Sequence, residues 1–171
     1  MSRPPARPEP LYFDVGALIE FSRFFADEVL AGRYPYIDYD AEKRWHQRIY
    51  RDQRMDVWLI SWLPTQGTQL HDHGGSSGSF TVLSGELTET LVSRSGRIRD
   101  VPRSTGASVG FGPRYIHDVR NASSAPAASV HVYSAPLSSM TYYDLQDGVL
   151  TSLATIETED PETEFSARVA S

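Results

Sequence analysis

From about residue 45 onward, the chain consists of short segments in which apolar and polar residues alternate. These segments are rich in Val, Thr, Tyr and Phe, and Gly, Pro, Asn or Ser separate them at steps of about ten residues, as is typical of β-strands. The expected strands cover residues 49–51, 55–62, 79–83, 86–93, 97–101, 107–111, 117–121, 129–133 and 140–145. Many short strands after a small helical prefix predict an all-β fold, namely a closed barrel or jelly roll.

The region before these strands has the period of a helix. Asp14 is a suitable N-cap and Gly32 a suitable end, so we predict a helix over residues 15–31. A second, shorter helix is expected near residues 39–44. Apolar residues of the first helix recur at three- and four-residue steps, as on a helix with one buried face; they are Leu18, Phe21, Phe24, Phe25, Val29 and Leu30.

Length and composition limit the size and the partners of this protein. The 171 residues suit one domain with its own core. A formal net charge of -6 argues against binding to nucleic acid or to an anionic membrane surface, and no stretch approaches the roughly 18 apolar residues of a membrane span. The absence of cysteine excludes disulfides, a thiolate nucleophile and iron–sulfur clusters. We therefore expect a monomeric cytoplasmic protein without nucleic-acid or membrane partners.

We divide the chain into four parts of a single domain, residues 1–171. Residues 1–12 contain four prolines and are expected to form a flexible arm. Residues 13–44 form the helical segment, and residues 45–157 form the barrel. Residues 158–171 begin with the acidic run TEDPETE, which predicts a frayed or solvated tail.

Histidine carries most of the chemistry that this sequence can offer. Residues two apart in a strand share a face, so His71 and His73 can be neighbouring ligands of one divalent metal ion. His117 is the candidate for a third ligand, from another strand. The same alternation turns Asp72 and Asp118 to the opposite face, which predicts a site without a carboxylate.

A run of small residues at 74–78 follows this pair and leaves room beside it for a metal and a bound group. A single His-x-His pair is nevertheless more often formed by surface or hydrogen-bonded histidines. The pattern alone therefore leaves a metal site and ordinary histidines as two open interpretations.

A second alternating set predicts a polar ladder inside the barrel. Ser129, His131 and Tyr133 face one way, into the barrel if Val130 and Val132 pack outside it. A serine can fix the tautomer of a histidine, which in turn can hold a tyrosine hydroxyl as a positioned proton donor. A buried polar ladder without catalytic function is the alternative.

Arginine provides the candidate group for binding an anionic substrate. The arginines between the helical segment and the second strand are Arg44, Arg48, Arg51 and Arg54. One of them would have to enter the barrel to form a bidentate pair with a carboxylate. Otherwise they form a solvated basic stretch.

These patterns together resemble the thiol dioxygenases of the cupin superfamily, whose type member is cysteine dioxygenase. Residues 67–78 (GTQLHDHGGSSG), followed by Gly85, resemble the first cupin motif, and residues 113–117 (PRYIH), with Asn121, resemble the second. Residues 129–134 (SVHVYS) match the Ser-x-His-x-Tyr element of that family. The resemblance covers roughly residues 44–145.

The resemblance implies a cupin domain, a double-stranded β-helix that oxidises a small thiol with dioxygen and ferrous iron. L-cysteine, converted to its sulfinic acid, is the first choice of substrate. The implied iron ligands are His71, His73 and His117, and the implied catalytic residues are Tyr133, His131 and Ser129. Arg48 falls where the family keeps the arginine for the substrate carboxylate, and His46, on the same face, is the residue nominated for the substrate amine.

Two departures from the family pattern narrow the resemblance. Gly78 stands where most cupins have a metal-binding glutamate and where mammalian members have a cysteine crosslinked to the tyrosine, so the chain is similar to the bacterial branch. Ala135 follows Ser134 where the family tends to have proline in a cis bond. A cis bond before alanine would cost about 2.5–4 kcal/mol, so we expect a trans bond here, or a strained exception.

Three other functions stay open at the level of sequence. The nearest is a dioxygenase for another small thiol carboxylate, of the 3-mercaptopropionate or mercaptosuccinate type. A different cupin enzyme that uses another metal is the second, because histidine sites also accept zinc, nickel and copper. A non-enzymatic metal-binding cupin is the third, although it would need neither the polar ladder nor an open metal face.

Overall fold

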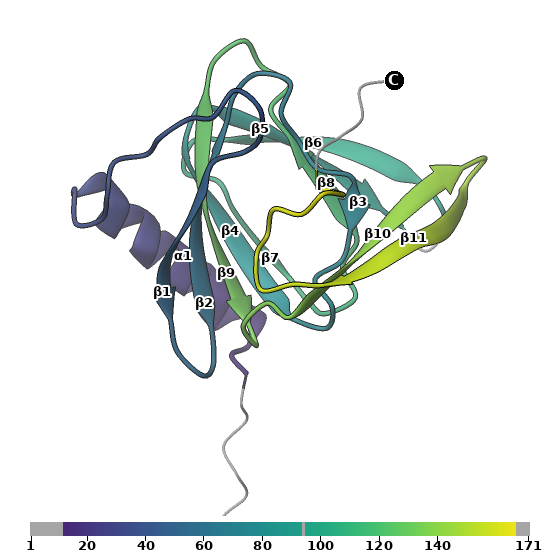
Figure 1. Ribbon diagram of the computed structural model, residues 1–171, viewed down its shortest axis with the longest axis horizontal. Helices are drawn as coiled ribbons and strands as arrows, with labels where there is room; N and C mark the ends of the chain where they lie inside the picture. Colours follow the sequence, from purple (N-terminus) through teal and green to yellow (C-terminus); the bar gives the residue numbers. More distant parts are fainter. Residues whose placement is uncertain (1–11, 94, 167–171) are drawn as a thin grey trace, which may run out of the picture.

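The computed structural model describes residues 12–93 and 95–166, which form two antiparallel β-sheets that enclose a common interior (Figure 1). One sheet has the strand order β1-β2-β9-β4-β7 and the other β11-β10-β3-β8-β5-β6. The strands are β1 (His46–Arg51), β2 (Asp56–Trp62), β3 (Leu70–His71), β4 (Ser77–Ser84), β5 (Glu86–Val92), β6 (Ile98–Ser104), β7 (Ser108–Phe111), β8 (His117–Arg120), β9 (Ala127–Ser134), β10 (Ser139–Gln146) and β11 (Val149–Glu157). The predicted all-β barrel is confirmed.

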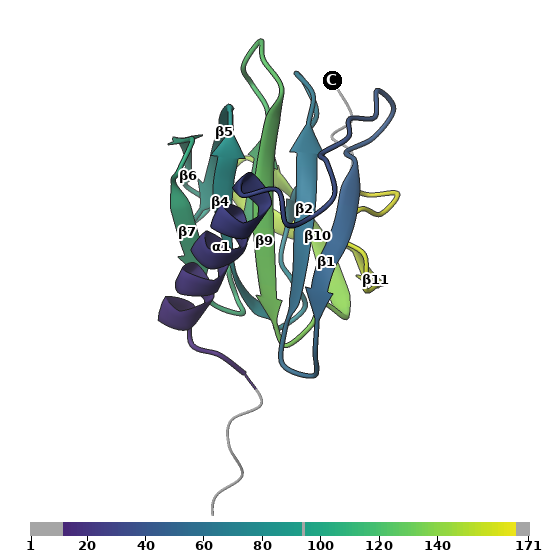
Figure 2. The ribbon, with the colours of Figure 1, turned by 90° about the vertical axis from the view of Figure 1, so that its left-hand side faces the viewer.

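Helix α1 (Val15–Leu30) lies against the outer face of β4, β7 and β9 (Figure 2). It begins as predicted, since Asp14 Oδ1 accepts a hydrogen bond from the Ala17 backbone N–H at 2.8 Å. Its end also agrees with the sequence. Gly32 has a φ of 77°, which lies in the left-handed region and is incompatible with a right-handed α-helix. Among residues 12–93 and 95–166, no helix is long and apolar enough to cross a membrane.

Strand β9 is buried on both faces, and its alternation separates two cores. Val130 and Val132 point outward and pack with Leu18 and Phe25 of α1. Tyr133 belongs to the core inside the barrel, as do the aromatic residues of the neighbouring β2, while the polar Ser129 and His131 share its face. The predicted orientation of the polar ladder into the barrel is thereby confirmed.

The second helix predicted near residues 39–44 is wrong. The segment bends instead, because the Asp40 carboxylate accepts hydrogen bonds from the backbone N–H groups of Glu42 at 2.8 Å and of Lys43 at 3.4 Å. A side chain that satisfies nearby backbone groups in this way competes with helical pairing. The Asp40 carbonyl also accepts from Gln66 Nε2 at 2.7 Å, which ties the bend to the barrel.

The part of the tail that the structure describes packs on the barrel through some of its residues, although Glu159 and Glu164 are exposed. The chain continues beyond β10 into β11, a strand that we did not identify, and residues 158–166 then pack back onto the barrel. Pro161 and Ser166 are buried, and Glu162 forms an ion pair with Arg44. The prediction of a solvated tail is wrong here because the acidic run finds basic partners in and before β1. Residues 167–171, like residues 1–11 of the arm, lie outside the described part.

The peptide bond between Ser134 and Ala135 is cis, so a trans bond is the wrong expectation at this position. Ser134 itself is held from two sides. Its hydroxyl donates to the Arg54 carbonyl at 2.7 Å and accepts from the Phe13 N–H at 3.0 Å.

Packing of α1 on the sheet should depend on its buried face. Leu18 is fully buried, so Leu18→Ala leaves a cavity and should lower the free energy of unfolding by about 2–5 kcal/mol. Leu30 is 66% exposed, and Leu30→Ala should change it by less than about 0.5 kcal/mol. Urea unfolding followed by circular dichroism measures the free energy of unfolding of both variants. Equal losses in the two variants would mean that α1 does not pack into the core shared with β9.

Candidate metal centre

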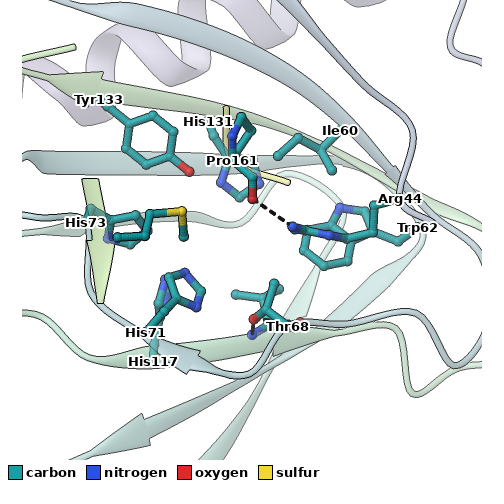
Figure 3. A pocket seen from close by; sticks show the side chains of 12 residues that line it. Arg44, Ile60, Trp62, Thr68, His71, His73, His117, His131, Tyr133 and Pro161 are labelled. Carbon is teal, nitrogen blue, oxygen red and sulfur yellow. Dashed lines mark hydrogen bonds between the residues drawn. The ribbon is translucent and has the colours of Figure 1, made fainter. Parts of the chain in front are cut away.

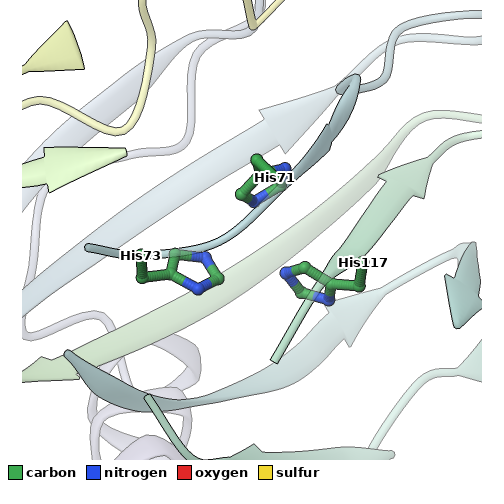
Figure 4. Close-up of side chains that lie close together, drawn as sticks. All are labelled: His71, His73 and His117. Carbon is green, nitrogen blue, oxygen red and sulfur yellow. The ribbon is translucent and has the colours of Figure 1, made fainter. Parts of the chain in front are cut away.

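Three histidines meet at the inner face of the second sheet (Figure 4). His71, the last residue of β3, lies directly opposite His117, the first residue of β8, in the strand register. His73 follows β3 in the next turn rather than within a strand, yet its ring joins the other two. One ligand atom from each of the three residues lies within 4.8 Å of the others, and all three side chains are buried. The predicted convergence is confirmed.

Hydrogen bonds determine which nitrogen two of these rings can offer. His71 Nδ1 lies 2.8 Å from the Gln69 carbonyl and His117 Nδ1 lies 2.8 Å from the Glu89 carboxylate. Both partners only accept, so each Nδ1 donates, and Nε2 is the nitrogen that each ring can offer to a metal ion. Nδ1 of His73 is buried and has no partner among the described residues, so this ring also has capacity for a ligand.

Burial keeps two of these imidazoles, those of His71 and His73, neutral. It lowers the pKa of His71 and of His73 well below the usual value, and the neighbouring histidines lower it further. A neutral imidazole is the form that binds a metal ion. Protonated rings at this spacing would repel each other, so the arrangement suits a cation bound between them.

The two aspartates next to these histidines point elsewhere, as alternation predicts. Asp72 accepts from the Tyr143 hydroxyl at 2.6 Å and from the Gly74 N–H at 3.0 Å, and so holds the turn that carries His73. Asp118 faces Arg120, whose Nη1 donates to it at 3.2 Å. Neither carboxylate joins the histidine group.

Glu89 is a functional residue that the sequence analysis missed. It is fully buried on β5 and accepts from His117 Nδ1, from the Tyr115 hydroxyl at 2.8 Å and from Arg103 Nη2 at 2.7 Å. Burial raises the pKa of this carboxyl, but the hydrogen bonds outweigh it and the net shift is downward, so Glu89 is ionised. The sequence pattern that could have indicated Glu89 is an acidic residue on the same strand face as the apolar Leu87 and Leu91.

Gly78 leaves no room for a fourth protein ligand. A Cβ atom built there would lie 2.4 Å from Phe111 Cζ and 2.9 Å from the Val132 carbonyl. The Phe111 ring fills this space and stacks on His73, with ring centroids 4.7 Å apart. The small-residue run therefore makes room for a phenylalanine ring at this position, and not for a bound group as we expected. A carboxylate ligand from position 78 is sterically excluded.

A narrow cavity lies beside the three histidines (Figure 3). The space left inside is about 10 Å³, about what one water molecule needs. Twelve residues line it: Arg44, Ile60, Trp62, Thr68, His71, His73, His117, Val119, His131, Tyr133, Met140 and Pro161. None of these described lining residues is acidic, and a single arginine is among them.

The polar ladder borders this cavity and is partly connected. Trp62 Nε1 donates to Ser129 Oγ at 2.9 Å, which leaves the serine proton for His131 Nε2 at 2.8 Å. Burial lowers the pKa of His131 well below its usual value, so its ring is neutral. The rings of His131 and Tyr133 are 6.4 Å apart between centroids, and the described residues show no hydrogen bond between them. The expected bond to the tyrosine hydroxyl is absent.

Tyr133 instead faces the histidine group. Its ring centroid lies 5.1 Å from that of His73, and Figure 3 shows its hydroxyl directed into the cavity. Burial, and then the charge of Asp56, raise the pKa of this phenol above its usual value. Tyr133 therefore remains a hydrogen-bond donor at neutral pH.

Arg48 and His46 are not among the residues that line the cavity. The Arg48 guanidinium lies over the Trp58 ring, 4.8 Å from its centroid, and donates to the Glu159 carbonyl at 3.3 Å. His46 Nε2 lies 2.9 Å from the Asp160 carboxylate. The assignment of these two residues to a substrate remains a prediction. Arg44 is the arginine found among the residues that line the cavity.

Comparison with known proteins identifies the family. A family model described as cysteine dioxygenase type I matches residues 26–146. The chain belongs to this family. It is a cupin of the thiol dioxygenase type, and its three-histidine group is the candidate metal site of a cupin oxidoreductase.

Solved structures support the cupin fold of this cysteine dioxygenase family member. The protein TT1209 from Thermus thermophilus is 26% identical, with a TM-score of 0.51 over 57% of this chain and 89% of that one. An uncharacterised protein with a double-stranded β-helix domain from Klebsiella pneumoniae is 16% identical, with a TM-score of 0.51 over 75% and 94%. An RmlC-like cupin protein from Desulfovibrio desulfuricans is 14% identical, with a TM-score of 0.50 over 58% and 89%.

Metal binding should depend on each of the three histidines. Replacing His71, His73 or His117 by alanine removes one of three ligands, so tight binding of a divalent ion should be lost. His46 lies outside the group, and His46→Ala should bind metal like the unchanged protein. Metal content after reconstitution and dialysis measures this. Full occupancy in His117→Ala would rule out a site made of these three residues.

The Phe111–Gly78 contact predicts a steric penalty at a single position. Gly78→Ala forces a methyl group against the Phe111 ring and the Val132 carbonyl, and should lower the free energy of unfolding by about 1–3 kcal/mol. Gly112→Ala is the matched control, because no atom lies within 4 Å of a Cβ built there. Thermal and urea unfolding distinguish the two variants. A stable Gly78→Ala protein would show that the ring moves aside freely.

Proposed function

We propose that this protein is a thiol dioxygenase that uses ferrous iron to oxidise a small thiol carboxylate, with L-cysteine as first choice and cysteine sulfinic acid as product. The overall reaction adds both atoms of dioxygen to the thiol sulfur, so that R–SH and dioxygen give R–SO₂H without another reductant. One observation carries the proposal, namely the convergence of three buried imidazoles. The Phe111 ring, which leaves no room for a carboxylate ligand at position 78, supports it.

The donor set fits the proposed ion. His71, His73 and His117 would hold it through neutral nitrogens, which leaves the ion its full double positive charge and open positions. Bound there, ferrous iron would supply the charge that lowers the pKa of a thiol and the redox chemistry that dioxygen requires. The Glu89 carboxylate orients His117 and increases the basicity of its Nε2.

The residues of the chain would position the substrate and supply a proton. Tyr133, with its hydroxyl in the cavity and protonated at neutral pH, can donate a hydrogen bond to an oxygen atom or a carboxylate beside the histidines. The Trp62–Ser129–His131 chain keeps a neutral imidazole next to this position. Because the residues that line the cavity are buried, these bonds act in a low dielectric.

A thiol acid without an amine is the second candidate substrate, of the 3-mercaptopropionate or mercaptosuccinate type. The observation that favours it is the lack of an acidic group among the described lining residues, since an ammonium would then have no carboxylate partner. His46, nominated for the amine, has its Nε2 engaged by Asp160. A metal-binding cupin without activity would have no need of a protonated tyrosine directed at the histidines.

Oxygen uptake by iron-reconstituted protein tests the proposal directly. The thiols to compare are L-cysteine, 3-mercaptopropionate, mercaptosuccinate and cysteamine, and mass spectrometry should show a product heavier by two oxygen atoms. A strong preference for 3-mercaptopropionate would make the second candidate correct. Uptake with none of these thiols would refute the proposed function.

Tyr133→Phe separates catalysis from metal binding. The hydroxyl is not a ligand, so this variant should keep its iron, yet its rate should fall roughly 10- to 1000-fold because one positioned donor is lost. Metal content and oxygen uptake are measured on the same sample. An unchanged rate would return Ser129, His131 and Tyr133 to a purely structural role.

A further inference from the structure

The carboxylate of Glu89 connects one of the three histidines to the surface of the barrel. Glu89 lies on β5, and the neighbours of β5 in the sheet are β8, which begins with His117, and β6, which carries Arg103 (Figure 1). The Glu89 side chain is fully buried, whereas that of Arg103 is 23% exposed. A buried negative charge therefore lies between a candidate metal ligand and a positive charge that reaches solvent.

The two oxygen atoms of this carboxylate have different partners. Oε1 accepts from His117 Nδ1 and from the Tyr115 hydroxyl, each at 2.8 Å. Oε2 accepts from Arg103 Nε at 2.9 Å and from Arg103 Nη2 at 2.7 Å. Hydrogen bonds to an ionised carboxylate are stronger than bonds between neutral groups. Because Tyr115 and His117 share one oxygen atom, they compete for the same negative charge.

Among the three histidines, His117 is the one whose Nδ1 has a charged partner. Nδ1 of His71 bonds the neutral Gln69 carbonyl at 2.8 Å, and Nδ1 of His73 has no partner among the described residues. A charge placed behind the histidine group can therefore act on a bound metal ion through the His117 ring.

The bond to Glu89 makes the His117 ring a stronger electron donor. The carboxylate attracts the proton on Nδ1 and thereby increases the basicity of Nε2, the nitrogen that would bind the metal. Stronger donation stabilises a ferric ion more than a ferrous ion, because the ferric ion has the larger charge. The negative charge of Glu89 therefore favours the oxidised form of iron.

Arg103 and Tyr115 act in the opposite direction. Each donates to the Glu89 carboxylate and so withdraws negative charge from the bond to His117. Removal of either partner would leave more of that charge to the histidine ring. Neither of these two described residues lines the cavity or joins the histidine group. Both can thus change electron donation by His117 without contact with a metal ion or a substrate.

We propose that Glu89, Arg103 and Tyr115 are positioning residues that set the balance between ferric and ferrous iron through His117. Glu89 favours the ferric form, and Arg103 and Tyr115 shift the balance back towards the ferrous form. The identity of the metal rests here on the proposed function. That function requires ferrous iron, so a carboxylate behind the ligand needs partners that moderate its charge.

Redox titration of the iron-loaded protein, without any thiol, tests the direction of each effect. Glu89→Gln keeps an acceptor for His117 Nδ1 but removes the charge, so the ferric-to-ferrous ratio at a fixed potential should fall roughly tenfold. Arg103→Gln and Tyr115→Phe should each raise this ratio roughly three- to tenfold. A merely structural role would disturb the site in the same way in all three variants. Shifts of the same sign in all three, or no shift in any, would overturn the proposal.

Two control variants remove the same chemical groups at positions without a contact to Glu89. Arg99→Gln removes an exposed arginine from β6, and Tyr50→Phe removes a phenol that donates to the Asp52 carboxylate at 3.1 Å. Neither should change the ferric-to-ferrous ratio by more than about 1.5-fold, because solvent screens an exposed charge. An effect of Arg99→Gln as large as that of Arg103→Gln would overturn the assignment to the bond with Glu89.

Affinity for Co²⁺ is a second measurement that requires neither iron nor activity. Glu89→Gln should weaken Co²⁺ binding roughly 10- to 100-fold, the usual effect of removing the partner of a metal-binding histidine. Arg103→Gln and Tyr115→Phe should bind Co²⁺ at least as tightly as the unchanged protein. Weaker binding in these two variants would mean that both residues only hold the site together, and would overturn the proposal. If Glu89→Gln does not fold, these two partly exposed positions still test the sign of the effect.

The two proposals can fail separately. If no thiol supports oxygen uptake but the ferric-to-ferrous ratio shifts in opposite directions, the proposed function is wrong and the role of Glu89 stands. If uptake is normal but the three variants leave the ratio unchanged, the dioxygenase function stands and the role of Glu89 is wrong. A protein that binds neither Fe²⁺ nor Co²⁺ would overturn both.

Discussion

Three imidazoles buried within ligand distance of one another are the constraint on which the rest of this structure depends. Burial lowers the pKa of His71 and His73, so these two rings are neutral and can each present a lone pair to the centre. The direct pairing of His71 with His117 across β3 and β8 establishes that centre. The turn held by Asp72 adds His73 to it. A cation is the natural occupant of such a group.

The surroundings of the site adjust its chemistry. Glu89 places one negative charge behind His117, and Arg103 and Tyr115 keep that carboxylate ionised. On the other side, Phe111 occupies the space that a larger residue at position 78 would fill. Among the described residues, the negative charge thus lies behind one of the three histidines, and no carboxylate joins the histidine group.

The barrel interior is polar along one strand face and nearly full. Strand β9 makes this possible because its outer face, covered by α1, supplies a separate apolar core, and its inner face can then carry Ser129, His131 and Tyr133. Residues 158–166 lie across the barrel interior. Pro161 of this segment lines the cavity, and Glu162 forms an ion pair with Arg44. Carboxylate–arginine contacts hold this segment against the barrel.

Local periodicity was sufficient to predict much of this protein. The period of two defined most strands, and it placed His71 and the Ser129–His131–Tyr133 face correctly, because side-chain direction in a strand depends on position parity alone. The N-cap at Asp14 was also predictable from a single residue. Contacts between distant segments could not be predicted in this way. Examples are the contacts of Glu89 with His117, of Phe111 with Gly78 and of Arg44 with Glu162, whose partners are 28, 33 and 118 positions apart in the sequence. Only the tertiary structure decides such contacts, because they depend on which strands are neighbours in a sheet. They also depend on which of several arginines residues 158–166 contact.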